Sequence, residues 1–499
     1  MTEKFVLGRL PTGVPGLDEL LGGGLPELSF NLIAGSPGSG KTTLAHQIMF
    51  ALAGPHRRAI FFTVLGEPAL KMLRYQQQYS FFDLGKLDES IRFVNLAEEV
   101  THGDLEGVLA RIVAEVEQFE PGLVFVDSFR SVVLAAQATA QGIPVLQQFV
   151  QRLGMYLTSW QATTFLIGEY MAVDAEANPV FTIADGILWL QQSLHRNSMV
   201  RKIQISKARG QATLAGLHTF RIANDGIQVF PRTLPALARP PGRAGAGARA
   251  PRAAARRLSM GIAALDDMMG GGLPQGYSLL VSGPSGSGKS QLATQFLAEG
   301  ARLGEKGIVV AFERSPGTSR SPRLDALIDD GDVAVVDTRA LDLSIDETLY
   351  AITELIRTTG ASRVVIDSLS GFELALAPTF REDFRESLHR MVAVLTGLGA
   401  SVVMVSELED RYTDLRFSPY GAAFLTDAII VQRYVELQGD LRRVMAVVKV
   451  RNSAHSRSLR LFDITDAGIS IGEPTPDMQA LLSGHPRLAA SPGSNDSTA

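Results

Sequence analysis

The chain of 499 residues contains no cysteine, which excludes disulfide bonds and thiolate metal sites and is typical of a reducing compartment. No apolar run approaches the roughly 18 residues that a membrane span needs, and the N-terminus lacks the apolar stretch of a secretory signal. A formal net charge of −5 gives no global field to attract nucleic acid or anionic lipid. The histidines lie far apart, without metal-ligand spacing. We therefore expect a cytoplasmic protein that is not bound to membranes.

The chain does contain two complete phosphate-binding loops of the pattern G-x-x-x-x-G-K-[ST]. One runs from Gly35 to Thr42 and the other from Gly283 to Ser290, each after an apolar stretch and before a helical pattern. Glycines let successive backbone N–H groups curl around phosphate oxygens, the lysine neutralises the terminal phosphates, and the hydroxyl ligates Mg²⁺. We predict that the chain binds two nucleoside triphosphates.

The expected nucleotide contacts of the loops are Ser36, Pro37, Gly38, Ser39, Gly40, Lys41, Thr42 and Thr43, and Pro284, Ser285, Gly286, Ser287, Gly288, Lys289, Ser290 and Gln291. Lys41 and Lys289 are also expected to act in catalysis.

The spacing of the motifs indicates a gene duplication rather than two unrelated nucleotide modules. Lys289 minus Lys41 gives 248, Asp367 minus Asp127 gives 240, and a second Lys-x-Arg motif follows the first after 242 residues. We predict a first domain over 1–234, a linker over 235–257, a second domain over 258–482 and a disordered tail over 483–499. The linker is rich in Ala, Arg, Gly and Pro, which favours a solvated spacer, with a basic patch for nucleic acid as the alternative.

Within each copy, apolar runs alternate with helical patterns, which predicts an α/β fold of two tandem RecA-like P-loop domains. Each is expected to hold a mostly parallel central sheet flanked by helices, with antiparallel strands toward its C-terminal end. The central strands are expected at 30–34, 60–64, 123–126 and 165–167, and at 279–282, 308–312, 364–366 and 402–405. Antiparallel strands are expected near 186–190, 200–206, 219–222 and 227–230.

Acidic residues at strand ends predict the metal site and the base. Asp127 and Asp367 each close an apolar strand, where a carboxylate can orient Mg²⁺ beside Thr42 or Ser290. Hydrolysis also needs a group that orients water against the γ-phosphate, and Glu313 ends the strand after the second loop helix. The alternative for Glu313 is a solvated strand-end acid. The first copy has Leu65 at the equivalent position, and Glu67 substitutes only if the chain bends there.

Two Lys-x-Arg motifs, Lys207 with Arg209 and Lys449 with Arg451, lie near the ends of predicted strands. Alternation places both cations of a motif on one face, where they could clamp a phosphate as arginine fingers do. Spacing alone equally allows solvated strand charges.

Together these motifs resemble the KaiC family of RecA-like ATPases. The resemblance rests on Leu-Asp and Gly-Gly-Gly-Leu-Pro within 17–26 and 265–274, the two loops, the Asp-Ser strand ends, Phe312-Glu313, both Lys-x-Arg motifs and the segment 426–455. It covers nearly everything outside the linker and the tail. It implies a homo-oligomer, one hexameric ring or two stacked rings, with ATP and Mg²⁺ at subunit interfaces. It also implies that Lys207, Arg209, Lys449 and Arg451 reach a neighbour's γ-phosphate and that His455 lies near nucleotide.

The chain departs from the family where two adjacent glutamates are usual after the second strand. The first copy has Leu65 and Gly66 there, and the second has Glu313 and Arg314. We expect the first site mainly to bind ATP and the second to hydrolyse it slowly. The two hydroxyl residues that the family's clock protein phosphorylates correspond to Ala423 and Phe424, so that cycle cannot run here, although Ser418 and Thr413 lie nearby.

Four functions follow from these features. The leading hypothesis is an oligomeric ATPase switch that an unidentified signalling protein reads. A Ser/Thr autokinase is the alternative. A RecA-type DNA recombinase is disfavoured by the acidic total charge, and the fourth hypothesis is a scaffold in which ATP has only a structural role.

Overall fold

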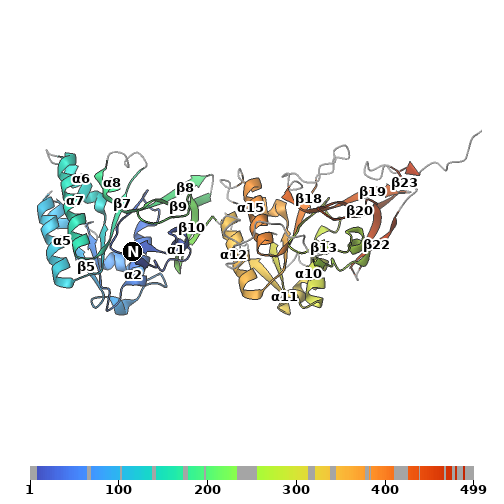
Figure 1. Ribbon diagram of the computed structural model, residues 1–499, viewed down its shortest axis with the longest axis horizontal. Helices are drawn as coiled ribbons and strands as arrows, with labels where there is room; N and C mark the ends of the chain where they lie inside the picture. Colours follow the sequence, from blue (N-terminus) through green and yellow to red (C-terminus); the bar gives the residue numbers. More distant parts are fainter. Residues whose placement is uncertain are drawn as a thin grey trace, which may run out of the picture. The chain divides into compact units, whose positions relative to one another are not determined.

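The computed structural model divides the chain into two compact units, Met1–Arg232 and Thr233–Ala499, which are considered separately (Figure 1). It describes residues 8–64, 69–101, 104–137, 142–171, 178–195, 198–232, 256–312, 321–337, 344–376, 381, 384–408, 425–437, 439–465, 468–474, 478–479 and 487–488. Among these residues, no helix combines the length and the apolar character needed to cross a membrane.

The first unit is built on a nine-stranded mixed sheet of order β11-β10-β9-β8-β3-β7-β6-β4-β5. Its strands are β3 (Phe30–Gly35), β4 (Ala59–Thr63), β5 (Ile91–Asn95), β6 (Leu123–Asp127), β7 (Thr163–Glu169), β8 (Gly186–His195), β9 (Ser198–Ala208), β10 (His218–Ala223) and β11 (Gly226–Phe230), and β1 (Arg9–Leu10) pairs with β2 (Leu25–Pro26). The helices are α1 (Leu17–Leu20), α2 (Lys41–Leu52), α3 (Ala69–Gln76), α4 (Ala97–Thr101), α5 (Leu105–Phe119), α6 (Phe129–Gln137), α7 (Gly142–Ser159) and α8 (Pro179–Ile183), with the 3₁₀ turn η1 (Leu84–Lys86).

The second unit repeats this arrangement in the order β16-β15-β17-β18-β14-β19-β20-β21-β22. Its strands are β14 (Ser278–Gly283), β15 (Gly307–Ala311), β16 (Val333–Asp337), β17 (Arg363–Asp367), β18 (Ser401–Glu407), β19 (Ala428–Leu437), β20 (Asp440–Val450), β21 (Arg460–Thr465) and β22 (Gly468–Pro474), with the pairs β12 (Arg257–Leu258) with β13 (Leu273–Pro274), and β23 (Met478–Gln479) with β24 (Arg487–Leu488). The helices are α9 (Ala263–Met268), α10 (Lys289–Arg302), α11 (Pro322–Asp329), α12 (Ile345–Thr359), α13 (Leu369–Ala375) and α15 (Phe384–Gly397).

Both faces of each sheet are buried, which explains why the central strands are almost wholly apolar. On β3, Leu32 faces the core that includes α5 and α7, and Ile33 faces the core that includes α2. Figure 1 shows α5, α6 and α7 grouped together at one side of the first unit. Because parallel strands covered by helices on both faces bury every side chain, the alternation of polar residues disappears. The predicted fold class is confirmed.

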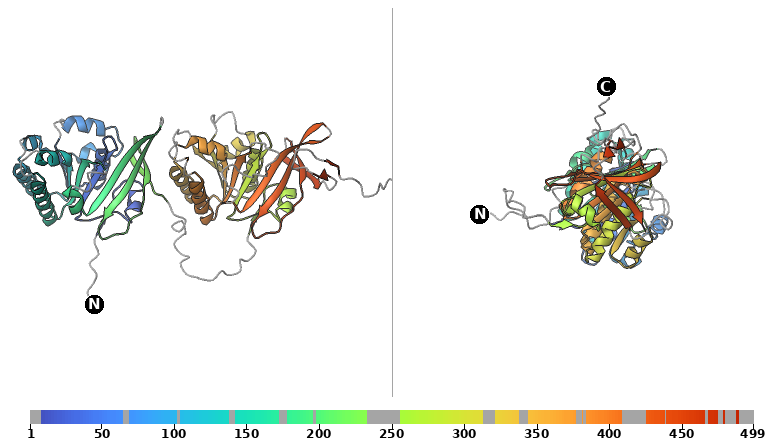
Figure 2. Two further views of the ribbon diagram at one scale, coloured as in Figure 1. Left: turned by 90° about the horizontal axis from the view of Figure 1, so that it is seen from above. Right: turned by 90° about the vertical axis from the view of Figure 1, so that its right-hand side faces the viewer.

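The structure differs from the sequence-based predictions at three places. The segment 186–190 was expected to be antiparallel, but β8 runs parallel to β3 and is antiparallel only to β9. The edge strands β5 and β16 were not predicted, and β24 lies within the expected tail. The remainder of that tail and the linker residues 235–255 lie outside the described residues. Figure 2 shows the long β8–β9 pair, in green, along one side of the first sheet, and the β19–β20 pair, in orange-red, along one side of the second.

Candidate functional site

Each phosphate-binding loop connects a central strand to a helix. The first leaves β3 at Gly35 and enters α2 at Lys41, and Gly40 has a φ of 99°, which L-residues with a side chain rarely adopt. A Cβ atom on Gly40 would also lie 2.7 Å from Ile222 Cδ1. Gly288 repeats both features, with a φ of 101° and a Cβ position 2.7 Å from Ile464 Cδ1. The loop pattern therefore needs glycine at this position in both copies.

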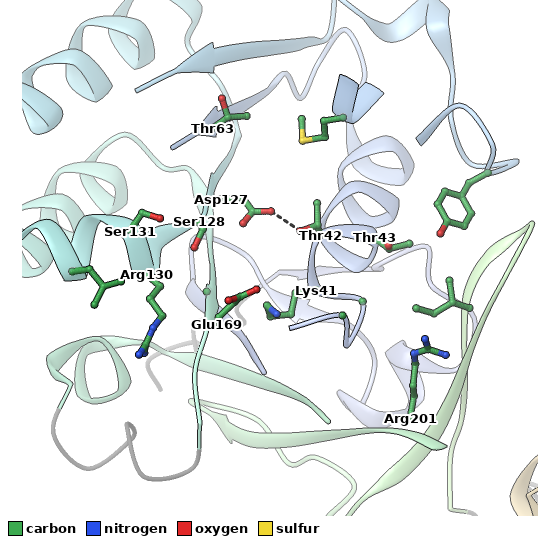
Figure 3. A pocket seen from close by; sticks show the side chains of 17 residues that line it. Lys41, Thr42, Thr43, Thr63, Asp127, Ser128, Arg130, Ser131, Glu169 and Arg201 are labelled. Carbon is green, nitrogen blue, oxygen red and sulfur yellow. Dashed lines mark hydrogen bonds between the residues drawn. The ribbon is translucent and has the colours of Figure 1, made fainter. Parts of the chain in front are cut away.

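The predicted metal-site residues of the first copy are in contact. Thr42, at the start of α2, donates a hydrogen bond from Oγ1 to Asp127 Oδ2 at 2.7 Å, and Asp127 ends β6 (Figure 3). Removal from water raises the pKa of Asp127 to about 6, although the Thr42 hydrogen bond and the Lys41 charge act in the opposite direction. A hydroxyl and a carboxylate oxygen side by side are donors that suit Mg²⁺, which usually takes one or two carboxylates together with phosphate oxygens. The donor set thus fits the expected ion.

Lys41 is buried, and its Nζ donates to the Ser36 carbonyl at 2.8 Å within the loop. Burial lowers its pKa, while the carboxylates of Glu169 and Asp127, in that order of effect, raise it. Figure 3 shows the side chains of Glu169 and Lys41 pointing toward each other. Glu169 ends β7 and was not predicted from the sequence. Thus the lysine lies between two carboxylates that come from different strands.

A pocket of about 720 Å³ surrounds the first loop. Its residues are Gly38, Gly40, Lys41, Thr42, Thr43, Thr63, Met72, Tyr79, Asp127, Ser128, Arg130, Ser131, Leu134, Gly168, Glu169, Arg201 and Ile222. In Figure 3, Arg130 and Arg201 lie on opposite sides of the loop. The pocket therefore offers cations on both sides of the lysine, of which the sequence had indicated neither. Ser36, Pro37 and Ser39 belong to the loop but do not line this pocket.

The second loop is arranged similarly. Lys289 is buried and its Nζ donates to the Pro284 carbonyl at 2.7 Å. Burial lowers its pKa, opposed by Glu407, at the end of β18, and then by Asp367. Ser287 Oγ donates to Gln432 Oε1 at 3.1 Å, whereas Ser290 and Gln291 are exposed at the start of α10. In each copy, the strand that pairs with the strand before the loop therefore ends in a glutamate near the loop lysine.

Lys207 and Arg209, the Lys-x-Arg motif of the first copy, do not line the pocket around the first loop. Lys207 Nζ donates to the carbonyls of Phe181 and Thr182, at 3.2 and 2.9 Å, at the end of α8. Each motif arginine forms an ion pair with an aspartate. The distance from Nη1 to Oδ1 is 3.1 Å for Arg209 and Asp185, and 3.4 Å for Arg451 and Asp427.

Burial is the largest cause that lowers the pKa of Lys207 and of Lys449. The arginine of the same motif also lowers it, and a nearby aspartate, Asp185 or Asp427, raises it. His455 follows β20, and its Nδ1 lies 3.5 Å from the Ser453 carbonyl oxygen.

A β-bulge precedes each Lys-x-Arg motif. In the β8–β9 pairing Ile187 faces Lys207 but Leu188 faces Ile205, so Ser206 is an extra residue. In the β19–β20 pairing Val448 is the extra residue in the same place. Because one extra residue reverses the alternation of faces, Lys207 lies on the opposite face from Ile205 and reaches α8. A sequence pattern of strict alternation does not reveal this reversal.

Several predicted residues lie outside the described part of the chain. These are Glu313 and Arg314, the corresponding Leu65, Gly66 and Glu67 of the first copy, and Thr413, Ser418, Ala423 and Phe424. Their predicted roles, and those of the other site residues, remain proposals.

A doubly buried parallel sheet with a glycine-lysine loop at the start of a helix and an aspartate at the end of a nearby strand defines a RecA-like P-loop ATPase. The family described as "ATPase: KaiC" matches residues 10–234 and 258–476. The chain therefore belongs to the KaiC ATPase family, and ATP binding and ATPase activity in general follow from that membership.

The chain is similar to curated proteins over almost its whole length. The "Circadian clock oscillator protein KaiC" of Rippkaea orientalis is 28% identical, over 97% of this chain and 93% of its own. The "Circadian clock oscillator protein KaiC 1" of Synechocystis sp. is 28% identical, over 96% and 92%. The "Circadian clock protein KaiC3" of the same organism is 27% identical, over 98% and 96%.

Proposed function

We propose that this protein is an oligomeric ATPase switch in which the first site mainly binds ATP and the second hydrolyses it. The observation that carries the proposal is the unequal pair of residues after the second central strand, Leu65 in the first copy and Glu313 in the second. Both copies otherwise have the loop lysine between two strand-end carboxylates. The difference between the sites is therefore in turnover rather than in the cradle for phosphate.

In the second site, Glu313 accepts a hydrogen bond from a water molecule and orients it toward the γ-phosphorus. The water oxygen forms a bond to phosphorus as the bond to the bridging oxygen of ADP breaks, and the proton is taken up by the carboxylate or the released phosphate. Lys289 neutralises charge on the β- and γ-phosphates during this step. Ser290 and Asp367 in the second site, and Thr42 and Asp127 in the first, would hold Mg²⁺, which would supply further charge neutralisation.

The ring is proposed because Lys207 and Arg209 do not line the pocket around the loop of their own copy. Lys207 and Arg209, and Lys449 and Arg451, would contact the γ-phosphate held by the neighbouring subunit, with His455 beside it. A hexamer with nucleotide at the subunit interfaces uses these cations, and a signalling protein distinguishes its ATP and ADP states. A cytoplasmic location and the absence of nucleic-acid binding belong to the same proposal.

The test is Glu313→Gln, which keeps the size of the side chain and removes the charge. We expect phosphate release to fall by about 10²-fold or more, since a positioned base contributes about 10²–10⁴-fold, while two nucleotides stay bound per chain. The matched control is Glu67→Gln in the first copy, which should leave turnover unchanged. Unchanged phosphate release in the Glu313→Gln protein would exclude this assignment.

A Ser/Thr autokinase is the second candidate, since the family resemblance includes such an activity. The same preparations incubated with ATP labelled at the γ-phosphate and analysed by mass spectrometry distinguish the two functions. Label on a Ser or Thr side chain supports the kinase, and label found only in free phosphate supports the ATPase switch.

A further inference from the structure

Tyr170 connects the nucleotide pocket of the first copy to its Lys-x-Arg motif. The residue follows Glu169 at the end of β7, and its backbone N–H donates to the Gly35 carbonyl at 3.2 Å. Gly35 is the first residue of the phosphate-binding loop. The backbone of Tyr170 is thus linked to the loop on one side and to a pocket carboxylate on the other.

The Tyr170 side chain folds back against the pocket wall. It is 2% exposed, and a Cβ atom on Gly168 would lie 2.4 Å from its ring. The Arg130 guanidinium lies 5.5 Å from the ring centroid, within the range of a cation–π contact. Gly168, Glu169 and Arg130 all line the pocket. A change in the pocket therefore acts directly on the position of this ring.

The far edge of the Tyr170 ring contacts α8. The Tyr170 and Phe181 rings meet edge to face, with centroids 5.1 Å apart and planes at 80°. The carbonyl of the same Phe181 accepts the hydrogen bond from Lys207, and Arg209 Nη2 donates to the Thr182 carbonyl at 3.3 Å. The short helix therefore holds both cations in place, and its position depends on the packing of Phe181.

Nucleotide binding would change the electrostatics beside the contact between Tyr170 and Phe181. Glu169 faces Lys41, and a bound triphosphate would bring several negative charges to the same lysine. Because like charges repel, the triphosphate would push the Glu169 carboxylate, and with it the adjoining Tyr170 backbone, away from the loop. The ring contact carries that displacement to Phe181.

The second copy has a different side chain at this position. Leu408 donates its backbone N–H to the Gly283 carbonyl at 3.0 Å, as Tyr170 does to Gly35. The side chains differ, however, because Ser406 and Leu408 take the places of Gly168 and Tyr170. Both copies thus share the backbone link to the loop, and leucine takes the place of the aromatic ring in the second.

We propose that Tyr170 is a positioning residue that couples triphosphate binding in the first site to the placement of Lys207 and Arg209, through its contact with Phe181. The inference rests on the proposed function, in which those cations contact a neighbour's nucleotide. It adds that the first site controls what its own subunit presents to that neighbour.

Tryptophan emission can test the coupling. The chain has two tryptophans, and Trp189 lies 5.7 Å from Phe181 by ring centroids. The parent protein carries Trp160→Phe, so that Trp189 is the sole tryptophan, and Lys289→Ala, so that only the first site binds MgATP. Emission is recorded during a MgATP titration, and bound nucleotide is counted separately.

We compare Tyr170→Phe, which retains the ring, with Tyr170→Leu, which has the side chain of the second copy. Phe181→Leu interrupts the same contact from the other side. The parent and Tyr170→Phe should show the MgATP-induced emission change, and both leucine variants should lose at least half of it while still binding one nucleotide. Equal emission changes in all four proteins would overturn the proposal, because Trp189 would then be responding through β3, which pairs directly with β8.

The emission and binding measurements distinguish a failure of the proposed function from a failure of the coupling alone. A parent that binds no MgATP would overturn the proposed function and this coupling together. A parent that binds MgATP with no change in Trp189 emission would overturn the coupling alone.

Discussion

At the residue scale, His46 is a buried group whose charge state distinguishes the two copies. It lies on α2, four residues after Thr42, and its ring is 4.6 Å from that of Phe61. Burial lowers its pKa to about 4, although the nearby Gln76 side chain acts in the opposite direction. The second copy has Thr294 at the equivalent position, 248 residues later. Apart from the loop lysines at their first residues, only the first of the two loop helices therefore carries a buried titratable group.

The stability of the first unit should depend on this histidine between pH 4 and 6.5. In that range the unfolded chain binds a proton at His46 and the folded chain does not, so the free energy of unfolding decreases as the pH falls. A shift from about 6.5 to about 4 corresponds to roughly 3 kcal/mol, which is fully present above the unfolded value and lost on acidification.

Urea unfolding followed by tryptophan emission measures this in the whole chain, because both tryptophans, Trp160 and Trp189, are in the first unit. The His46→Thr variant should be less dependent on pH than the natural chain, whatever its stability at pH 7. Parallel pH profiles for the two proteins would contradict the prediction.

The site residues that lie within short motifs were predicted from the sequence. Those that strand pairing brings to the loop from distant parts of the chain were not. Thr42 and Asp127 were predicted together and are hydrogen-bonded. Glu169 and Glu407 were not predicted, although each ends an apolar strand and they are separated by 407 − 169 = 238 residues. This interval is two residues shorter than the 240 that separates the aspartates, so a search that allowed a small deletion would have found them. Arg201 approaches from an antiparallel strand, and no local pattern indicates this.

At the scale of elements, the bulge in β9 decides where the first Lys-x-Arg motif lies. Ile203 and Ile205 face the core that contains α2, and after Ser206 it is Ala208 that contacts this core. Lys207 consequently faces α8. If Ser206 occupied a regular paired position instead of a bulge, alternation would place Lys207 on the same face as Ile205 and direct its amine into the α2 core.

The first unit should therefore tolerate deletion of Ser206. Ile205 and Lys207 would become successive residues on opposite faces of β9, with the same partners in β8, so the amine keeps its carbonyl partners and we expect a loss below about 1 kcal/mol in the free energy of unfolding. Ser206→Ala keeps the bulge and should remain within about 0.5 kcal/mol of the natural chain. Denaturant unfolding followed by tryptophan emission compares the two, and a deletion that costs several kcal/mol would contradict the prediction that Lys207 keeps its face without the extra residue.

The elements that sequence patterns predicted best are the buried central strands, whose apolar runs have no other explanation. The strands β5 and β16 were missed, and each pairs with a single neighbour at the edge of its sheet. In β5, Arg92 interrupts the apolar residues, whereas β16 is an apolar run of four residues that ends at Asp337 and could have been found. The direction of β8 was also wrong, since its alternating pattern resembles that of a hairpin strand although its first half pairs in parallel with β3.

At the scale of the whole molecule, each unit has its own pair of apolar cores and its own phosphate-binding loop. Each should therefore unfold as a cooperative unit that its own nucleotide stabilises. At a free ATP concentration of 100 times the Kd, binding adds about 2.7 kcal/mol to the unit that holds it. For units of this size, 1 kcal/mol raises Tm by roughly 2–4 °C.

Calorimetry of the whole chain with MgATP, together with tryptophan emission for the first unit, separates the two transitions. Lys41→Ala should abolish the ATP-induced rise in Tm of the first unit only, and Lys289→Ala that of the second only. Loss of both shifts in either variant would show that the units do not bind independently.

The extra residue before the Lys-x-Arg motif also indicates which features are older than the gene duplication. Since it occurs in both halves at the same register, the ancestor already had it before its gene was copied. The tyrosine contact with α8 occurs in the first half, whereas the second half has leucine there, so that difference arose after the copying event. The common ancestor thus already directed its lysine away from its own core, and descent later gave the two halves different links between that lysine and the site.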